Sequence, residues 1–242
     1  MAELPANLFA NPVWSALQTR HRDFSIVSGD STRYPADVAP FIAVSAPTET
    51  AMRDLFTLLT PGELVYLIGE NYPHIQQLAF GETFGVLQMV LPGETKMPEE
   101  LPAPQADSAT DVATTLVELS SADADEMIAL TTLAFPGYFR QRTCEMGKYY
   151  GVRSGGELIA MAGERLMHDG FAEISGVCTH PLHRGKGLAA RLMWRLIRNH
   201  RGQGTVSWLH VGSKNQRAIG LYERMGFQKV REVRLNPVSK KA

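Results

Sequence analysis

Two side chains in the C-terminal half of the sequence could move protons in a reaction. Glu173 lies in an otherwise small and apolar stretch. A carboxylate in a partly apolar cleft has a raised pKa and can accept a proton. Tyr222 is a phenol, and its ordinary pKa of about 10 suits the protonation of a leaving group of similar basicity. We therefore expect a general base and a general acid. His210 is the alternative base, and the structural alternatives are a salt bridge from the carboxylate to Arg165 and an ordinary core position for the phenol.

Between these two residues lies a glycine-rich loop with the composition of an anion site. Small and apolar residues run to Thr179, then Arg184-Gly185-Lys186-Gly187 follows, and leucines then recur at helical spacing. In such a strand–loop–helix segment the N–H groups and the dipole at the helix start favour negative charge. Glycine lets a phosphate approach the backbone, and Arg184 and Lys186 add positive charge. We therefore expect a phosphate-bearing ligand.

A dinucleotide is one ligand that such a loop could bind. The segment GKGLAA at 185–190 fits the dinucleotide fingerprint with alanine in the last place. That fold requires an acidic residue about 20 positions further on to hold a ribose hydroxyl. The corresponding strand, VSWLHV at 206–211, has none, and the phosphate-loop pattern GxxxxGK[ST] does not occur. The sequence therefore disfavours a dinucleotide oxidoreductase.

A second ligand class is supported by two motifs together. The pattern R-x-x-G-x-A at 184–189 resembles the acyl-CoA pyrophosphate loop of the GNAT superfamily of N-acetyltransferases, with Ala189 where many members have glycine. The pattern N-x-x-A-x-x-x-Y-x-x-x-G-F at 215–227 resembles the second signature of that family. The resemblance implies a mixed α/β GNAT fold over roughly 116–235. It also implies transfer of an acetyl group from acetyl-CoA, as co-substrate, to a primary amine by direct attack in a ternary complex.

The resemblance assigns roles to particular residues. Backbone N–H groups of the loop would hold the pyrophosphate, the strand edge at 177–179 would pair with the pantetheine arm, and Asn215 would cap its helix and contact CoA. A covalent route through Cys178 lacks a partnered base. The implied cofactor-binding residues are Val177, Cys178, Thr179, Arg184, Gly185, Lys186, Gly187, Leu188, Ala189 and Asn215. The implied acceptor-binding residues are Phe135, Tyr138 and Phe139, which could equally cover the core under a loop.

Several alternatives stay open. Some members of the superfamily carry a catalytic glutamate eleven residues before the position of Arg184, where Glu173 stands, and others use a chain of waters. A catalytically silent acyl-CoA-binding or regulatory module would keep the loop but make no use of Glu173 and Tyr222. The acceptor could be a small amine or amino acid, a peptide N-terminus or a protein lysine. No motif indicates the oligomeric state.

Composition limits the class of protein. The chain has 242 residues, 44% of them hydrophobic, and a net charge of −1, which suits one large or two small globular domains. Basic residues gather after Pro181, where the bland interpretation places Arg195, Arg198 and Arg201 on a solvated helix face. No apolar run reaches the ~20 residues of a membrane span, and the first residues do not form a signal peptide. We expect a cytoplasmic protein with two free cysteines, no metal, no nucleic-acid partner and no membrane contact.

The elements suggest two domains. Prolines and acids between Met97 and Thr110 are typical of a linker, so we place a boundary near residue 108. Residues 1–108 are predicted to form a smaller α/β domain of unknown role, compatible with a degenerate GNAT-like half. Its helices are expected at 11–21 and 48–59 and its strands at 24–27, 41–44, 64–68 and 86–91. Residues 109–242 are predicted to form the acyltransferase domain in the order βααβββαβαβ. In the predicted strand at 172–179, regular alternation places Glu173 on one face with Ser175 and Val177.

Overall fold

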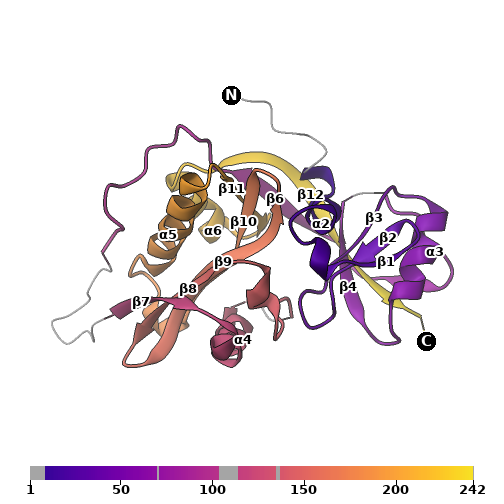
Figure 1. Ribbon diagram of the computed structural model, residues 1–242, viewed down its shortest axis with the longest axis horizontal. Coiled ribbons are helices and arrows are strands. Elements are labelled where there is room, and N and C mark those ends of the chain that lie inside the picture. Colours follow the sequence, from indigo (N-terminus) through magenta and orange to yellow (C-terminus); the bar gives the residue numbers. More distant parts are fainter. Residues whose placement is uncertain (1–8, 70, 104–113, 135–136, 242) are drawn as a thin grey trace.

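A nine-stranded mixed sheet runs through the length of the molecule (Figure 1). The computed structural model describes residues 9–69, 71–103, 114–134 and 137–241. Here residues 9–103 are called the N-terminal part and residues 114–241 the C-terminal part. The strand order is β4-β12-β6-β11-β10-β9-β8-β7, with β5 also paired to β12. The strands are β4 (Leu64–Ile68), β5 (Leu78–Phe80), β6 (Phe84–Val90), β7 (Thr114–Leu119), β8 (Tyr149–Ser154), β9 (Glu157–His168), β10 (Phe171–Thr179), β11 (Val206–Gly212) and β12 (Gln228–Lys240).

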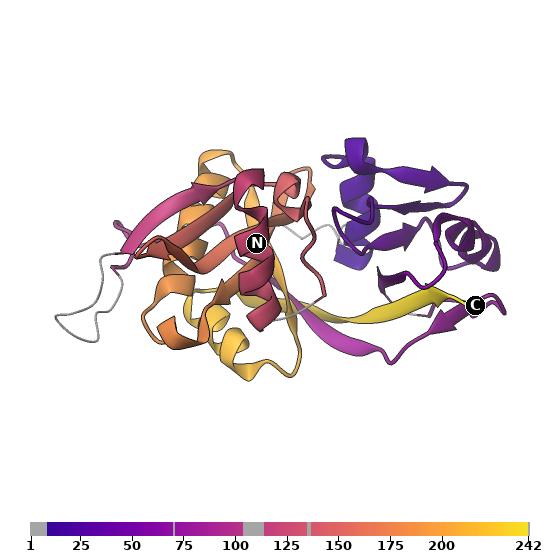
Figure 2. The same ribbon diagram turned by 90° about the horizontal axis from the view of Figure 1, so that it is seen from below.

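A small antiparallel sheet lies beside one end of the large sheet (Figure 2). Its strands are β1 (Ile26–Ser28), β2 (Ser31–Arg33) and β3 (Ile42–Val44). The α-helices are α2 (Pro12–Gln18), α3 (Glu49–Leu58), α4 (Ala124–Ala134), α5 (Leu188–Gly202) and α6 (Gln216–Arg224). Short 3-10 turns occupy Arg22–Phe24, Ser121–Asp123, Thr143–Met146 and Pro181–His183.

Local capping chemistry explains where the helices begin. The Asn11 side chain accepts a hydrogen bond from the Trp14 N–H, and Pro12 fills the first helical position. Thr48 caps α3 by accepting from the Ala51 N–H. Both predicted helices of the N-terminal part are therefore confirmed, although α2 ends at Gln18, before the predicted His21.

The predicted order of elements in the C-terminal part is also confirmed. All its strands occur where expected, but the second of its predicted helices is only the 3-10 turn at Thr143–Met146. Gly226 ends α6 with a φ of +97°, the left-handed conformation that favours glycine. The order gives the mixed α/β architecture that was predicted. Two short strands, β2 and β5, were not predicted, and β12 continues past the predicted end at Leu235 to Lys240.

The large sheet takes strands from both sides of residue 108. Strand β6, from the N-terminal part, lies between β11 and β12 and pairs antiparallel with both of them. Strand β4 extends the sheet beyond β12. The position of the predicted boundary lies outside the described residues, so the division into two domains there stays a prediction. The sheet itself is a joint structure of both parts (Figure 1).

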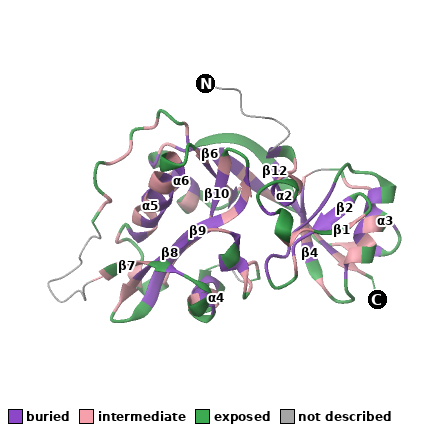
Figure 3. Cartoon of the chain, in the orientation of Figure 1, coloured by how far each residue is buried: buried purple, intermediate pink, exposed green. Residues whose placement is uncertain are grey.

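Helices cover both faces of the sheet. Successive residues of a strand point to opposite faces, so neighbouring side chains pack against different helices. On β8, Tyr150 packs in the apolar cluster that contains Leu192 and Leu196 of α5. Its neighbour Tyr149 packs in the cluster that contains Met127 of α4. The central strands β9 and β10 are accordingly buried along most of their length (Figure 3).

The basic face of α5 is not simply solvated. Arg201 donates to the Thr95 carbonyl at 2.6 Å, and Arg198 donates to the Glu99 carbonyl at 3.0 Å. Arg191 reaches the Pro102 carbonyl at 2.8 Å. The expectation of a solvated face is therefore wrong for Arg198 and Arg201, because the segment 92–102 runs along the helix and offers its carbonyl oxygens to the guanidinium groups.

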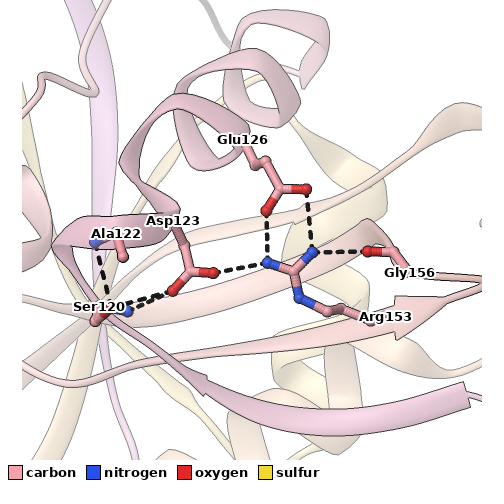
Figure 4. A network of polar contacts seen from close by, with 6 residues as sticks. All are labelled: Ser120, Ala122, Asp123, Glu126, Arg153 and Gly156. Carbon is pink, nitrogen blue, oxygen red and sulfur yellow. Dashed lines mark hydrogen bonds and ion pairs between the residues drawn. The ribbon is translucent and has the colours of Figure 1, made fainter.

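An ion-pair network fixes α4 to the hairpin of β8 and β9 (Figure 4). Ser120 and Asp123 form a capping box at the start of the helical segment. Arg153 on β8 bonds Asp123 at 2.7 Å, the carboxylate of Glu126, and the Gly156 carbonyl at 2.8 Å. This network holds the helix that precedes the loop of Tyr138.

Candidate active site between diverging strands

Strands β10 and β11 are parallel neighbours that pair over only their first three residues. The pairs are Phe171 with Val206, Ala172 with Ser207, and Glu173 with Trp208. The remaining residues of β10 and β11 are not paired with each other. Beyond these three pairs the two strands separate, and a cavity lies between them. It is lined on one side by 174–177 of β10 and on the other by 210–212 of β11. The opening between the strands is thus the location of the candidate site.

A β-bulge shapes the β10 side of this opening. Ser175 lies opposite Gly163 and Cys178 opposite Met161, so Gly176 and Val177 together face a single residue of β9. Such a bulge removes one residue from the hydrogen-bond ladder and re-aims the strand. Gly176 adopts a φ of +63°, a conformation that side chains disfavour. Its backbone conformation thus depends on glycine, a feature that we had not singled out in the sequence.

The cavity has a volume of about 270 Å³ and receives residues from both parts of the chain. Helix α6 contributes Asn215, Ala218 and Tyr222, close to the β10 edge where the thioester arm was expected. The C-terminal part also contributes Tyr138, Arg165 and Leu235. The N-terminal part contributes Phe41, Ile68, Phe84 and Val86. None of these four residues was predicted to line the site.

Tyr222 lines the cavity, as its predicted role requires. Its side chain is largely buried, and burial raises the pKa of the phenol to about 12. The hydroxyl therefore stays protonated through the neutral range and can only donate its proton. The pKa of this phenol is therefore further from that of a leaving thiol than the ordinary phenol pKa would be. Asn215 caps α6 by accepting from the Ala218 N–H at 3.2 Å, which confirms its predicted structural role.

Glu173 lies beside the cavity but does not line it. Arg165 donates to its two oxygens at 3.0 and 2.6 Å, and the Leu166 N–H donates at 3.1 Å. The residue is 0% exposed. Burial alone would raise the pKa of this carboxyl, but the charges and hydrogen bonds of Arg165 and His210 hold the pKa below its usual range. The expected apolar cleft and raised pKa are therefore wrong, because the carboxylate is ion-paired.

The reason lies in the neighbouring strand β9. Ala172 pairs with Met167 and Ile174 with Glu164, so the extra residue of this bulge lies on β9, where Arg165 and Leu166 together face Glu173. Ser175 and Val177 line the cavity, whereas Glu173, which alternation placed on the same face, is directed to Arg165. A catalytic role of Glu173 stays a prediction, and its salt bridge with Arg165, the structural alternative, is present.

His210 connects Glu173 to the cavity. Its Nδ1 lies 2.8 Å from the Glu173 carboxylate, and its Nε2 lies 3.1 Å from the amide nitrogen of Gln88. The same amide nitrogen donates to the Phe9 carbonyl at 2.8 Å, so it is a donor to His210 as well. In this arrangement Nε2 accepts from the amide and Nδ1 donates to the carboxylate. Among the described residues, the Gln88 Oε1 atom is buried without a hydrogen-bond partner.

The predicted anion loop has the backbone of an open helix start. Gly185 and Gly187 have φ angles of +87° and +76°, and Gly187 is the N-cap of α5. Glycine offers no capping side chain, so the first N–H groups of α5 have no side-chain acceptor. Arg184 is exposed beside the loop. An anion could approach these N–H groups directly.

The remaining predicted residues divide between cavity, strand edge and core. Val177 lines the cavity, and Thr179 is half-buried at the end of β10. Cys178 is buried, and burial raises the pKa of its thiol to about 12, which opposes a thiolate nucleophile. Tyr138 lines the cavity, but Phe139 is buried against Tyr149 with ring centres 5.6 Å apart. Phe135 lies outside the described residues.

Metal binding and membrane crossing each require a feature that can be recognised in the structure. In the described part of the chain, no group of three or more histidine, cysteine, aspartate or glutamate side chains is arranged to hold a metal ion. Within the same ranges, none of the helices combines the length and apolar character needed to cross a bilayer.

Comparison with known sequences finds a family profile that matches the C-terminal part and also finds related proteins. The sequence profile of the Acetyltransferase (GNAT) family matches residues 116–227. N-alpha-acetyltransferase RimI of Mycobacterium tuberculosis is 32% identical over 127 residues, which are 48% of this chain and 79% of that protein. The residues matched by the family profile include the anion loop and the 215–227 motif.

Comparison with solved structures extends the likeness to the N-terminal part. A crystal structure from Novosphingobium aromaticivorans, described as a GNAT-family acetyltransferase, is 31% identical and covers 97% of this chain and 99% of that chain, with a TM-score of 0.81. A GCN5-related N-acetyltransferase from Kribbella flavida is 18% identical and shares the fold over 100% of this chain and 98% of that chain, with a TM-score of 0.59. Both likenesses include the strand inserted from the N-terminal part.

Proposed function

This chain belongs to the GNAT family of acetyltransferases, and we propose that it transfers the acetyl group of acetyl-CoA to a primary amine. The amine attacks the thioester carbonyl directly while both substrates are bound, without an acyl-enzyme. The observation that carries this proposal is the cavity between β10 and β11, because it adjoins the strand edge at Val177 and includes Tyr222. The relative from Mycobacterium tuberculosis is named as an N-alpha-acetyltransferase, which supports an amine acceptor.

In the proposal, acetyl-CoA binds along β10 toward the start of α5. The N–H groups after Gly187 and the side chains of Arg184 and Lys186 hold the pyrophosphate. The edge of β10 at 177–179 pairs with the pantetheine arm as an added strand would. The bulge at Gly176 supports a further role for this edge, because a backbone N–H outside the ladder can polarise the thioester carbonyl.

Two proton transfers accompany the reaction. The amine nitrogen forms a bond to the carbonyl carbon, the carbon–sulfur bond breaks, and Tyr222 donates its proton to the departing sulfur. The proton of the amine passes to Nε2 of His210, which Glu173 orients through Nδ1. Glu173 thus acts through His210. Proton uptake requires the Gln88 amide to give up its bond to Nε2, and rotation of that amide presents its oxygen to the new N–H.

The first experiment is a calorimetric titration with acetyl-CoA of the wild type and two glycine variants. Gly187→Val introduces a side chain at the start of α5, where the phosphates are proposed to bind. Gly204→Val is the matched control, since it lies just after the same helix with a φ of +67° and, like Gly187, has open space around a Cβ atom. We expect at least tenfold weaker binding for Gly187→Val and unchanged binding for Gly204→Val.

The outcomes separate the proposal from its alternative. Equal loss of binding in both variants, or no binding by the wild type at millimolar acetyl-CoA, would contradict the proposed acetyl-CoA site. Tight binding without thiol release from any primary amine would instead favour a catalytically silent acyl-CoA-binding module.

A further inference from the structure

We propose that the acceptor is a primary amine carried on an apolar group, aromatic or branched aliphatic, and that the N-terminal part of the chain selects it. This inference rests on the proposed acetyl transfer. It assigns a substrate class to the end of the cavity that lies away from β10 and α6. It also assigns a role to the N-terminal part, which the sequence left without one.

The wall supplied by the N-terminal part is apolar. Phe41, Ile68, Phe84 and Val86 all line the cavity, and Leu235 of β12 lies in register with Phe84 on β6. The opposite wall, at Val177 and Tyr222, belongs to the proposed thioester end. An amine that reaches the thioester must therefore place the group next to its nitrogen against these side chains. Burying apolar surface there stabilises a bound amine.

The charges around the cavity disfavour a polycationic acceptor. Arg165 is the one lining residue, among those the structure describes, that carries a permanent charge, and none of the described lining residues is an aspartate or glutamate. Glu173 lies behind the wall and is already ion-paired with Arg165. A polyamine or an aminoglycoside would bring several positive charges into this space without a free carboxylate to receive them, which is costly.

Two aromatic contacts hold the apolar wall in place. Tyr138 of the C-terminal part lies against Tyr66 of β4, with ring centres 5.0 Å apart. The Arg165 guanidinium lies over the Phe41 ring at 4.8 Å. Phe84 differs from these residues because it is 39% exposed, an unusual exposure for a phenylalanine that lines a cavity. An apolar acceptor would cover this ring, so Phe84 is the residue through which the wall can be tested.

The test measures kcat/KM at a fixed pH for amines that differ in the group next to the nitrogen. The probes are 2-phenylethylamine, spermidine, and two tetrapeptides that differ only in having phenylalanine or aspartate at the N-terminus. The peptide pair distinguishes a chain N-terminus from a free amine as the source of the apolar group. We expect at least a tenfold preference for 2-phenylethylamine over spermidine, or for the phenylalanine peptide over the aspartate peptide.

Variants locate the selectivity. Phe84→Ala is expected to lower kcat/KM for the preferred apolar amine about tenfold. Leu64→Ala removes a similarly exposed apolar side chain, 47% exposed, from strand β4 outside the cavity lining, and is expected to leave kcat/KM unchanged. A preference for spermidine or the aspartate peptide, or equal effects of the two variants, would overturn the inference.

Failure of the proposed function would look different. In that case no amine would release CoA, whatever its charge. Calorimetric binding of 2-phenylethylamine and spermidine to the protein with CoA present would then decide the inference by itself. Tighter binding of 2-phenylethylamine that is weakened by Phe84→Ala would support the apolar site, and equal or tighter binding of spermidine would overturn it.

Discussion

The two ends of the β10–β11 pair differ in what the same two strands do. At the closed end, 171–173 pair with 206–208, and Glu173 is fully buried between Arg165 and His210. At the open end, 174–177 and 210–212 face a cavity that also receives Tyr222. Both ends contain a residue that the sequence marks as catalytic. The difference teaches that chemical type alone does not identify a catalytic group, because pairing and burial decide whether it can reach a substrate.

The largest effect is expected from breaking the closed end. Glu173→Gln removes the charge opposite Arg165 and leaves a buried guanidinium uncompensated, which typically costs about 3–5 kcal/mol of unfolding free energy. Urea unfolding measures this loss. Glu126→Gln is the control, since Glu126 pairs with Arg153 at the surface with 47% of its side chain exposed. Its loss should stay below about 1 kcal/mol. Unchanged stability of Glu173→Gln would show instead that the fold does not depend on the charge of this carboxylate.

Tyr222→Phe probes the open end. Removal of the hydroxyl should lower kcat about a hundredfold, the low end of what general acid catalysis contributes. Acetyl-CoA affinity should change less than twofold, because the ring and its contact with Phe227 are retained. Steady-state turnover and calorimetric binding provide the two measurements. Full activity of this variant would remove Tyr222 from the mechanism and leave water as the proton donor.

A buried ion pair far from the cavity sharpens the comparison. Arg33 of β2 donates to both carboxylate oxygens of Glu63, and these bonds lower the pKa of that carboxyl to about 2. Glu63→Gln should cost about 2 kcal/mol of stability at pH 7 and leave kcat/KM unchanged. Since the folded pKa lies below the unfolded value of about 4.3, this stabilisation is complete above that value and is lost as the pH falls toward 2. Unfolding free energies at several pH values test this, and a difference that persists at pH 2 would contradict the assigned pair.

The smallest effect is expected at the junction of the two ends. Gly176→Ala places a methyl group 3.3 Å from the Tyr149 ring at a φ of +63°, which should cost about 1 kcal/mol. It should also lower kcat/KM severalfold by altering the bulge. Gly170→Ala has similar backbone strain, with a φ of +78° and open space around it, and should leave kcat/KM unchanged. Thermal unfolding and initial rates separate the two, and equal rates would exclude a functional role of the bulge.

Local chemistry made most of the fold predictable. The starts of three helical segments could be predicted from their capping residues, Asn11, Thr48 and Ser120. A capping side chain bonds to a backbone N–H within three residues of itself, so its effect is visible in the local sequence. The anion loop was predictable for the same reason, since Gly185 and Gly187 need left-handed backbone that the sequence supplies locally. The 215–227 motif likewise fixes a helix and its cap.

Long-range pairing was not predictable from these patterns. Nothing in the residues of β6 states that its partners are β11 and β12, because a strand's alternation is the same whichever strand it joins. The contribution of Phe41 and Phe84 to the cavity was missed for that reason. The surroundings of Glu173 were mispredicted because its partners Arg165 and His210 come from the two neighbouring strands, and β9 has a bulge opposite Glu173.

The insertion of β6 has a consequence for how the chain is made. The strand FGVLQMV is synthesised early, but both of its partners come from the last quarter of the chain. At about 5–20 residues per second, translation leaves this apolar segment without its partners for roughly ten seconds. During that interval its edge groups are open to other strands, so the topology exposes the nascent segment to mispairing until residues 206–240 are made.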